Sequence, residues 1–238
     1  MPGPRSELIP LLSVVIPTLD EARRLPRILH DLSALTLPHE IIVTDGGSTD
    51  GTVEVAVSHG CRVVQGPAGR GRQLRSGVNA TAGEWLLVLH ADVRLPPQAV
   101  AEAERVLARP EVQCASWPLA IAAPGGWFRW VERGAALRWR LLGLAYGDQG
   151  LLVRRVVYEA AGGYPDSRIM EDVVLVRRIG RIAPIERLRH PIVADARRWS
   201  REGQVRGTLR NLTLLLLFLA GVKPDRLARW YLPEPRAQ

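Results

Sequence analysis

The sequence predicts an α/β protein with a mostly parallel sheet, helices on both faces of the sheet and a helical tail at the C-terminus. Three observations carry this prediction. Over residues 11–107, short apolar runs alternate with segments of helical periodicity. The run 84–89 is too short for a membrane span and leads into His90 and Asp92, as expected of a buried strand that ends at a ligand site. After residue 199 the pattern becomes that of a long amphipathic to apolar helix.

The first half of the chain is expected to alternate strictly between strands and helices. Strands are predicted over residues 11–16, 40–44, 61–65 and 84–89. The helices that follow them are expected over residues 25–32, up to residue 58, up to residue 81 and over residues 97–107. Asp20 is expected to cap the first helix, and Ser48, Thr49 or Asp50 the second, because short polar side chains accept hydrogen bonds from exposed helix amides.

The second half is predicted to be less regular. Strands are expected over residues 113–121, 151–154, 182–188 and 191–195. Helices are expected over residues 127–142 and 156–161, from Met170 to about residue 179, over residues 199–222 and near Tyr231. No Gly/Ser-rich linker interrupts the pattern, so we expect one continuous domain over residues 1–238.

The charge balance favours an anionic partner. The chain has a formal net charge of +8 and a sequence pI of about 10.6, and Lys223 is its only lysine. Arginine binds phosphate groups through two parallel hydrogen bonds, so a nucleotide, a nucleic acid or an acidic membrane surface would fit. A GC-rich genome would raise the arginine content equally, without functional meaning.

Three features bear on the location of the protein. Cys61 and Cys114 are far apart and form no CxxC pair, which fits a reducing compartment. Residues 1–10 contain no apolar core of a signal peptide. The longest apolar run, 212–222, is about half as long as the ~20 residues that a spanning helix needs. We therefore expect a cytoplasmic protein, and peripheral contact with the inner face of the cell membrane stays open.

Polar residues follow two of the predicted strands. His90 and Asp92 are alternate residues, so their side chains can face one ligand together, although Asp92 could equally cap the next turn. Asp45 precedes a glycine-rich turn. There it could accept hydrogen bonds from a base or ribose, or bond its own backbone. Neither interpretation is decided by these residues alone.

Charged residues also gather at predicted helix starts. Arg70 and Arg72 precede a helix, which suits a diphosphate but also a solvated basic loop. The pair Glu171-Asp172 would complement the positive end of a helix even without a catalytic role. The segment 197–199 (RRW) would often be mere surface charge. The order of all these pieces along the chain is more informative than any one of them.

Taken together, these pieces resemble a family 2 glycosyltransferase with a GT-A fold. The matching segments are SVVIPTLDE (13–21), VTDGGSTDGT (43–52), HAD (90–92), ED (171–172) and RRW (197–199). The short length, the HAD segment and GDQG (147–150) resemble a bacterial subgroup labelled arsenosugar-biosynthesis glycosyltransferases. The resemblance implies a nucleotide-sugar-binding half over about residues 11–110, an acceptor half over about 111–200 and C-terminal helices over about 200–238.

Combined with the residue patterns, the resemblance implies specific roles. The donor, a nucleotide-diphosphate sugar, would be bound by Pro17, Thr18, Glu21, Asp45, Arg70, Arg72, Ala91 and Asp92. The acceptor side would comprise Asp148, Gln149, Glu171, Arg198 and Trp199. Asp172 would be the general base of an inverting reaction. Neighbouring residues of a helix point about 100° apart, so only one of the two acids at 171–172 should face the acceptor.

A divalent metal, Mg²⁺ or Mn²⁺, is also implied. Asp92 matches the last carboxylate of the family's DxD motif and would hold the metal on the diphosphate, with His90 assisting or contacting the ribose. The chain departs from the family pattern at three positions. His90 replaces the first Asp of DxD, Thr44 precedes Asp45 where a second acid is frequent, and Asp195 stands where Gln is usual. The departure at Asp195 and the lack of a long apolar span disfavour a processive polymerase.

The prediction is therefore an inverting, metal-dependent, hexosyltransferase-like enzyme whose acceptor the sequence does not specify, with no nucleic acid as a partner. A nucleotidyltransferase is less favoured, because it needs a glycine-rich signature with Arg and Lys where PTLDE (17–21) stands. The other alternative is a non-catalytic basic protein that binds nucleotides, nucleic acid or a membrane surface. Trp127, Trp130, Trp139 and Trp199, interleaved with arginines, would then serve as stacking or interface anchors, or they would simply pack the second half.

Overall fold

Seven strands form the central sheet, and one of them runs against the others. Across the sheet they are β3 (Arg62–Gln65), β2 (His39–Asp45), β1 (Leu12–Thr18), β4 (Trp85–Val88), β8 (Leu151–Arg154), β6 (Cys114–Ser116) and β9 (Ile185–Arg187). Only β8 pairs antiparallel with its neighbours, so the sheet is mostly parallel, as predicted. The computed structural model describes residues 12–197 and 203–231.

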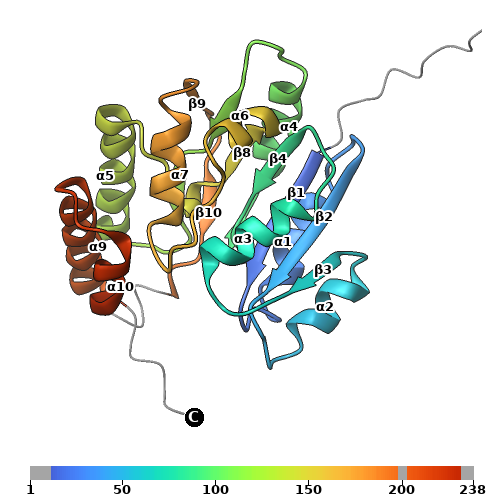
Figure 1. The fold of residues 1–238 in the computed structure, drawn as a ribbon, viewed down its shortest axis with the longest axis horizontal. Coiled ribbons are helices and arrows are strands. Elements are labelled where there is room, and N and C mark those ends of the chain that lie inside the picture. Colours follow the sequence, from blue (N-terminus) through green and yellow to red (C-terminus); the bar gives the residue numbers. More distant parts are fainter. Residues whose placement is uncertain (1–11, 198–202, 232–238) are drawn as a thin grey trace, which may run out of the picture.

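Helices cover both faces of this sheet (Figure 1). Alternate residues of a strand point to opposite faces, so Leu12, Val14 and Ile16 of β1 join one apolar cluster and Val15 joins the other. The first cluster is covered by α1 (Leu25–Leu32), α2 (Thr52–Ser58) and α4 (Pro97–Leu107). The second is covered by α3 (Arg70–Asn79), α6 (Arg155–Ala160) and α7 (Glu171–Ile179). The sequence-based prediction of helices on both faces is confirmed.

The single strand predicted over residues 113–121 was wrong, because two strands of different sheets occupy this segment. β6 belongs to the central sheet, whereas β7 (Leu119–Ile121) pairs with β10 (Ile192–Ala194) in a three-stranded sheet completed by β5 (Val93–Arg94). Pro118 separates them, and it lacks the amide hydrogen that a continuous ladder would need. The small sheet brings residue 195 beside the end of the β4 segment.

Of the predicted helix caps, Asp50 does accept the amide hydrogen of Thr52, the first residue of α2, at 3.1 Å, whereas the cap at Asp20 is absent. Asp20 does not cap α1; it has a φ of 54°, and its carboxylate accepts the amide hydrogen of Thr49 at 2.8 Å. In return, Asp50 accepts the amide hydrogen of Ala22 at 3.1 Å. Gly51, with a φ of 86°, precedes α2. Asp20 and Asp50 therefore hold the loops after β1 and β2 together.

Helices α5 (Gly126–Leu142), α9 (Gln204–Leu219) and α10 (Pro224–Tyr231) lie at the end of the molecule away from β3 (Figure 1). The 3₁₀ turn η1 (Gly147–Gln149) follows α5 in the chain. Arg198 and Trp199 lie outside the described residues, as does the predicted beginning of the tail helix. Within the described part of the chain, none of the helices combines the length and apolarity that crossing a membrane requires. Of the tryptophans in α5, Trp139 is buried, whereas Trp130 is exposed.

Candidate active site

A cavity of about 660 Å³ opens at the carboxyl ends of β1 and β4. The strand order β3-β2-β1-β4 means that the chain leaves β1 toward one side of the sheet and later returns to its other side. Open α/β sheets bind ligands at this kind of reversal, because the loops there diverge and leave a crevice. Pro17, Thr18 and Glu21 line the cavity from the end of β1.

The segment after β4 brings the HAD residues into the cavity. His90, Ala91 and Asp92 all line it. The amide of Leu89 still bonds the carbonyl of Val15 at 3.1 Å, so the segment leaves the sheet only at its last polar residues. The carbonyl of Asp92 accepts the amide hydrogen of residue 195 at 3.1 Å, which fixes the backbone of Asp92 between the two sheets.

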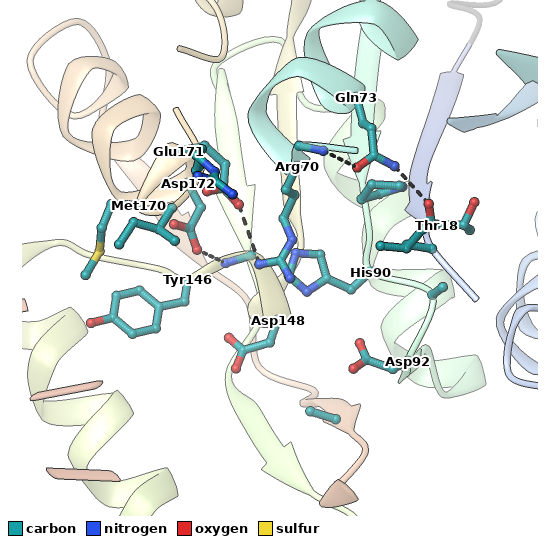
Figure 2. Close-up of a pocket in the computed structure, with 18 of the residues that line it drawn as sticks. Thr18, Arg70, Gln73, His90, Asp92, Tyr146, Asp148, Met170, Glu171 and Asp172 are labelled. Atoms are coloured by element: carbon teal, nitrogen blue, oxygen red, sulfur yellow. Dashed lines mark hydrogen bonds and ion pairs between the residues drawn. The ribbon is translucent and has the colours of Figure 1, made fainter. Parts of the chain in front are cut away.

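Arg70, at the first turn of α3, reaches into the middle of the cavity beside His90 (Figure 2). Its guanidinium lies 3.5 Å from a carboxylate oxygen of Glu171. Burial lowers the pKa of Arg70, but the carboxylates of Glu171, Asp172, Asp92 and Asp148 together raise it above its ordinary value. Arg70 therefore pairs with Glu171, lies in the electrostatic field of three further carboxylates and presents a positive charge at the N-terminus of α3.

Gln73 is a cavity residue that the sequence analysis missed. Its side-chain amide donates to the carbonyls of Thr18 and Thr44, both at 2.8 Å, and its oxygen accepts the amide hydrogen of Gly69 at 3.2 Å. One buried side chain thus joins the ends of β1 and β2 to the beginning of α3. The sequence feature that could have indicated Gln73 is its place directly before the buried Leu74 of α3.

Asp45 lies apart from the cavity lining. It is 1% exposed, and its carboxylate accepts the amide hydrogens of Gly47 and Ser48, both at 2.9 Å, and the hydroxyl of Thr18 at 3.2 Å. The hydroxyl of Ser48 donates to it as well. Burial raises the pKa of Asp45, but these hydrogen bonds lower it below its ordinary value. In this structure Asp45 shapes the loop beside the cavity.

The segment 195–197 is tied to the loop after β1 by ion pairs. Glu21 contacts Arg197 at 3.0 Å and Arg24 at 3.3 Å, and Arg24 also contacts Asp195 at 3.2 Å. Asp195, which stands where the family usually has Gln, is therefore part of this network. Arg72, by contrast, is not among the lining residues, and its side chain pairs with Asp166 at 3.1 Å.

The N-terminus of α7 delivers two acids that point apart. Glu171 is only 2% exposed and turns toward Arg70. Asp172 turns toward η1, where its Oδ2 accepts the amide hydrogen of Gly147 at 2.6 Å (Figure 2). Both acids line the cavity. Met170, just before them, has a φ of 60°, a left-handed conformation that is uncommon for non-glycine residues and concentrates at functional sites.

The protonation of Glu171 predicts a pH-dependent stability. Burial raises the pKa of Glu171, Arg70 opposes the shift and Asp172 adds to it, so that it is raised to about 7. A folded-state pKa above the unfolded-state value gives stability that is lost as pH rises through the folded-state value. We therefore expect the unfolding free energy of the wild type, relative to Glu171→Gln, to fall as pH rises from about 5 to about 8. Urea titrations across this range measure it, and a constant difference would contradict the prediction.

The 3₁₀ turn η1 forms the wall opposite β1. Asp148 lines the cavity, whereas Gln149 lies beneath it and is buried. The Gln149 side chain accepts hydrogen bonds from Arg138 at 2.7 Å and the amide of Tyr146 at 3.1 Å, and donates to the carbonyl of Trp117 at 3.0 Å. Gln149 thus supports the turn that presents Asp148.

Gly147 is required by close packing in this wall. A Cβ atom at this position would lie 2.4 Å from Nε2 of His90 and 3.4 Å from Oδ2 of Asp172. We expect Gly147→Ala to displace both side chains, weaken donor binding and cost about 1–3 kcal/mol of stability. Gly134→Ala is the matched control, because nothing lies within 4 Å of its Cβ and alanine favours a helix. Calorimetry and urea unfolding report the two effects, and equal behaviour of both variants would contradict the prediction.

The charges of the cavity bear on whether it fits a metal. Its lining contains six carboxylates against three guanidiniums; the acids are Glu21, Asp92, Asp148, Glu171, Asp172 and Asp195, and the bases are Arg70, Arg168 and Arg197. A diphosphate would add further negative charge, so a divalent cation bound with it would be favoured. No group of three His, Cys, Asp or Glu side chains in residues 12–197 and 203–231 could hold a metal unaided. A cation whose other ligands are phosphate oxygens and water fits these residues, with Asp92 as protein ligand.

Comparison with known proteins identifies the family to which this chain belongs. The model of glycosyl transferase family 2 matches residues 13–155, more than half of the chain, and the protein belongs to this family of transferases. It is 33% identical, over 107 residues, to the undecaprenyl-phosphate 4-deoxy-4-formamido-L-arabinose transferase of Yersinia enterocolitica, a match covering 40% of this chain and 33% of the relative. An uncharacterized glycosyltransferase of Mycobacterium bovis is 34% identical over 99 residues, a match that covers 40% of this chain and 44% of the relative. The match thus spans less than half of these relatives.

Solved structures show the same fold. A Pyrobaculum calidifontis mannosyltransferase in complex with GDP-Man and Mn²⁺ superposes with a TM-score of 0.60 at 20% identity, covering 79% of this chain and 57% of that one. Glucosyl-3-phosphoglycerate synthase of Mycobacterium tuberculosis, in complex with Mn²⁺, UDP and glucosyl-3-phosphoglycerate, superposes with a TM-score of 0.56 at 24% identity. The superposition covers 78% of this chain and 70% of the synthase chain. The predictions of family and GT-A fold are confirmed. The resemblance to the arsenosugar subgroup stays a prediction.

Proposed function

We propose that this protein transfers a sugar from a nucleotide-diphosphate sugar to an acceptor hydroxyl, with inversion at the anomeric carbon. One observation carries the proposal: Asp92, which suits a metal-bound diphosphate, and Asp172, a carboxylate of another element, line the same cavity with Arg70 between them (Figure 2). An inverting transfer needs both groups in one cavity, because the base and the leaving group act on opposite faces of the sugar. The relatives that carry Mn²⁺ with GDP-Man or UDP support the donor class.

The donor side is proposed to act through position and charge. Pro17, Thr18 and Glu21 would hold the nucleoside at the end of β1. Arg70 and the N-terminus of α3 would face the diphosphate. Asp92, with His90 beside Arg70, would hold Mg²⁺ or Mn²⁺, and a bound divalent cation supplies charge stabilisation for the leaving diphosphate.

On the acceptor side, Asp172 is proposed to take the proton of the acceptor hydroxyl. The acceptor oxygen then forms a bond to the anomeric carbon as the bond from that carbon to the diphosphate breaks. The hydrogen bond from Gly147 to Oδ2 holds the Asp172 carboxylate in orientation, and each carboxylate oxygen keeps further lone-pair capacity. Glu171 would position Arg70, and Asp148 would face the acceptor from η1.

A donor screen tests this proposal. UDP-, GDP- and dTDP-sugars are titrated into the protein by calorimetry with Mg²⁺, Mn²⁺ or EDTA, and donor hydrolysis is followed in parallel. We expect one nucleotide class to bind, with the metal required for full affinity. The same titration with duplex DNA tests the basic-protein alternative. If DNA binds and no donor does, the proposal is wrong.

A cytoplasmic location also stays a prediction. Cys61 and Cys114 are free, buried thiols, which fits a reducing compartment. We propose that the protein also contacts the inner face of the cell membrane peripherally.

A further inference from the structure

One face of α9 carries an apolar stripe that no packing partner among the described residues covers. Val205, Leu209, Leu212, Leu216 and Leu219 are 37% to 57% exposed. Their spacing of four, three, four and three residues places all five along one side of the helix. The opposite side packs inward through Leu214 and Leu215. The stripe is therefore an outward face of an anchored helix, not a misplaced core.

The part of the chain that carries this stripe is basic. Residues 203–229 contain five basic residues, Arg206, Arg210, Lys223, Arg226 and Arg229, and one acid, Asp225, so their net charge is +4. Arg206 stands on α9 next to the stripe, and Lys223 follows the last turn of the helix. An apolar face with basic flanks is the pattern of helices that lie in the interface of an anionic bilayer.

A second stripe lies on α5, at the same end of the molecule (Figure 1). Trp130, Leu137 and Leu141 are exposed, and their spacing places them on one side of α5. The guanidinium of Arg133 lies 5.5 Å from the ring centroid of Trp130. Tryptophan beside arginine suits the boundary between lipid headgroups and acyl chains, where one end of the ring is apolar and the other is wet.

We infer that the outward face of α9 docks on the surface of an anionic lipid bilayer. The same spacing of leucines could pair two copies of the chain, as in a coiled coil. Such pairing would bring the basic flanks of two copies together, whereas anionic headgroups neutralise them. Asn211 and Leu214 of α9 line the cavity, so docking would bring the cavity to within about one helix diameter, ~10 Å, of the bilayer.

Vesicle sedimentation of the full chain tests this surface. We expect binding to vesicles of phosphatidylcholine and phosphatidylglycerol at low salt, and weak binding to pure phosphatidylcholine or in 0.5 M NaCl. Leu209→Gln with Leu216→Gln should lower the partition coefficient about tenfold or more, because two apolar contacts are lost. The matched control is Val57→Gln with Ile182→Gln, two exposed apolar residues outside α9 and α5, which should bind like the wild type.

Three outcomes would overturn the inference. The first is equal loss of binding in the control variant, and the second is unchanged binding in the α9 variant. The third is a wild-type dimer, measured by light scattering, that the α9 variant converts to a monomer while neither protein binds vesicles. Donor affinity, measured on the same samples, should be the same in all variants. A protein that binds vesicles but no donor would refute the proposed function and leave the docking surface intact.

Discussion

Asp172→Asn is expected to lower kcat for sugar transfer by about a hundredfold or more, with nearly unchanged donor affinity. Asparagine keeps the size of the side chain but cannot take the acceptor proton. The carboxylate lies in the cavity wall formed by α7 and η1, away from the residues at the end of β1 that are proposed to hold the nucleoside. A donor-binding role would change affinity, whereas a base acts on the chemical step. Steady-state kinetics with the donor and acceptor pair that supports turnover, together with calorimetry, separate the two.

Two control variants make this result specific. Glu171→Gln removes the neighbouring acid, which faces Arg70, so its effect on kcat should be smaller. Asp166→Asn removes an exposed carboxylate that pairs with Arg72 outside the cavity, and it should behave like the wild type. If Glu171→Gln loses turnover and Asp172→Asn keeps it, the base has been misassigned. If neither substitution matters, Asp148 becomes the candidate or the reaction is not an inverting transfer.

The residues proposed to bind the donor could be brought together from the sequence, because their position depends on the local order of strands and turns. Strand-ending polar residues in a parallel sheet meet at one edge, whatever the details of packing. This rule is enough to bring Thr18 and Asp92 to one cavity, and the helix start after β3 brings Arg70 there. Asp45 also stands at the end of β2, but its side chain lies outside the cavity lining and accepts hydrogen bonds from Gly47, Ser48 and Thr18, so its role in donor binding stays a prediction. A turn-forming aspartate and a ligand-binding aspartate have the same sequence context.

The rest of the site depends on tertiary packing that local patterns do not encode. Gln73 matters only because α3 crosses the ends of β1 and β2, so that one amide meets two strand carbonyls. Asn211 and Leu214 enter the cavity because α9 folds back against α7, where Phe218 lies 5.6 Å from the guanidinium of Arg177. The division of residues 113–121 between two sheets likewise follows from pairing with β8 and β10, which are distant in sequence.

Asp92→Ala is expected to abolish metal-dependent donor binding while the fold survives. The carboxylate stands four residues after the end of β4, lines the cavity and is the residue proposed to hold the cation on the diphosphate. Loss of an outer partner of a metal site costs about 10–100-fold in affinity, so loss of a carboxylate ligand should cost at least as much. Asp166→Ala, outside the cavity, is the matched control. Calorimetry in Mn²⁺ measures the donor affinity, and thermal unfolding checks the fold.

His90→Ala is expected to lower donor affinity less than Asp92→Ala does, and this difference tests the metal assignment. The imidazole packs against the backbone of Gly147, at a position where a Cβ would lie 2.4 Å from Nε2, so its role in the wall is partly steric. Water and phosphate oxygens can fill a vacated coordination position, but they cannot replace the negative charge of Asp92. His90→Ala should therefore keep a donor affinity that responds to Mn²⁺, whereas Asp92→Ala should bind donor equally weakly in Mn²⁺ and in EDTA. If the donor affinity of Asp92→Ala still rises with Mn²⁺, the metal is held by another carboxylate. Asp148 is then the candidate, because Asp148 and Asp92 lie on either side of the space below Arg70 (Figure 2).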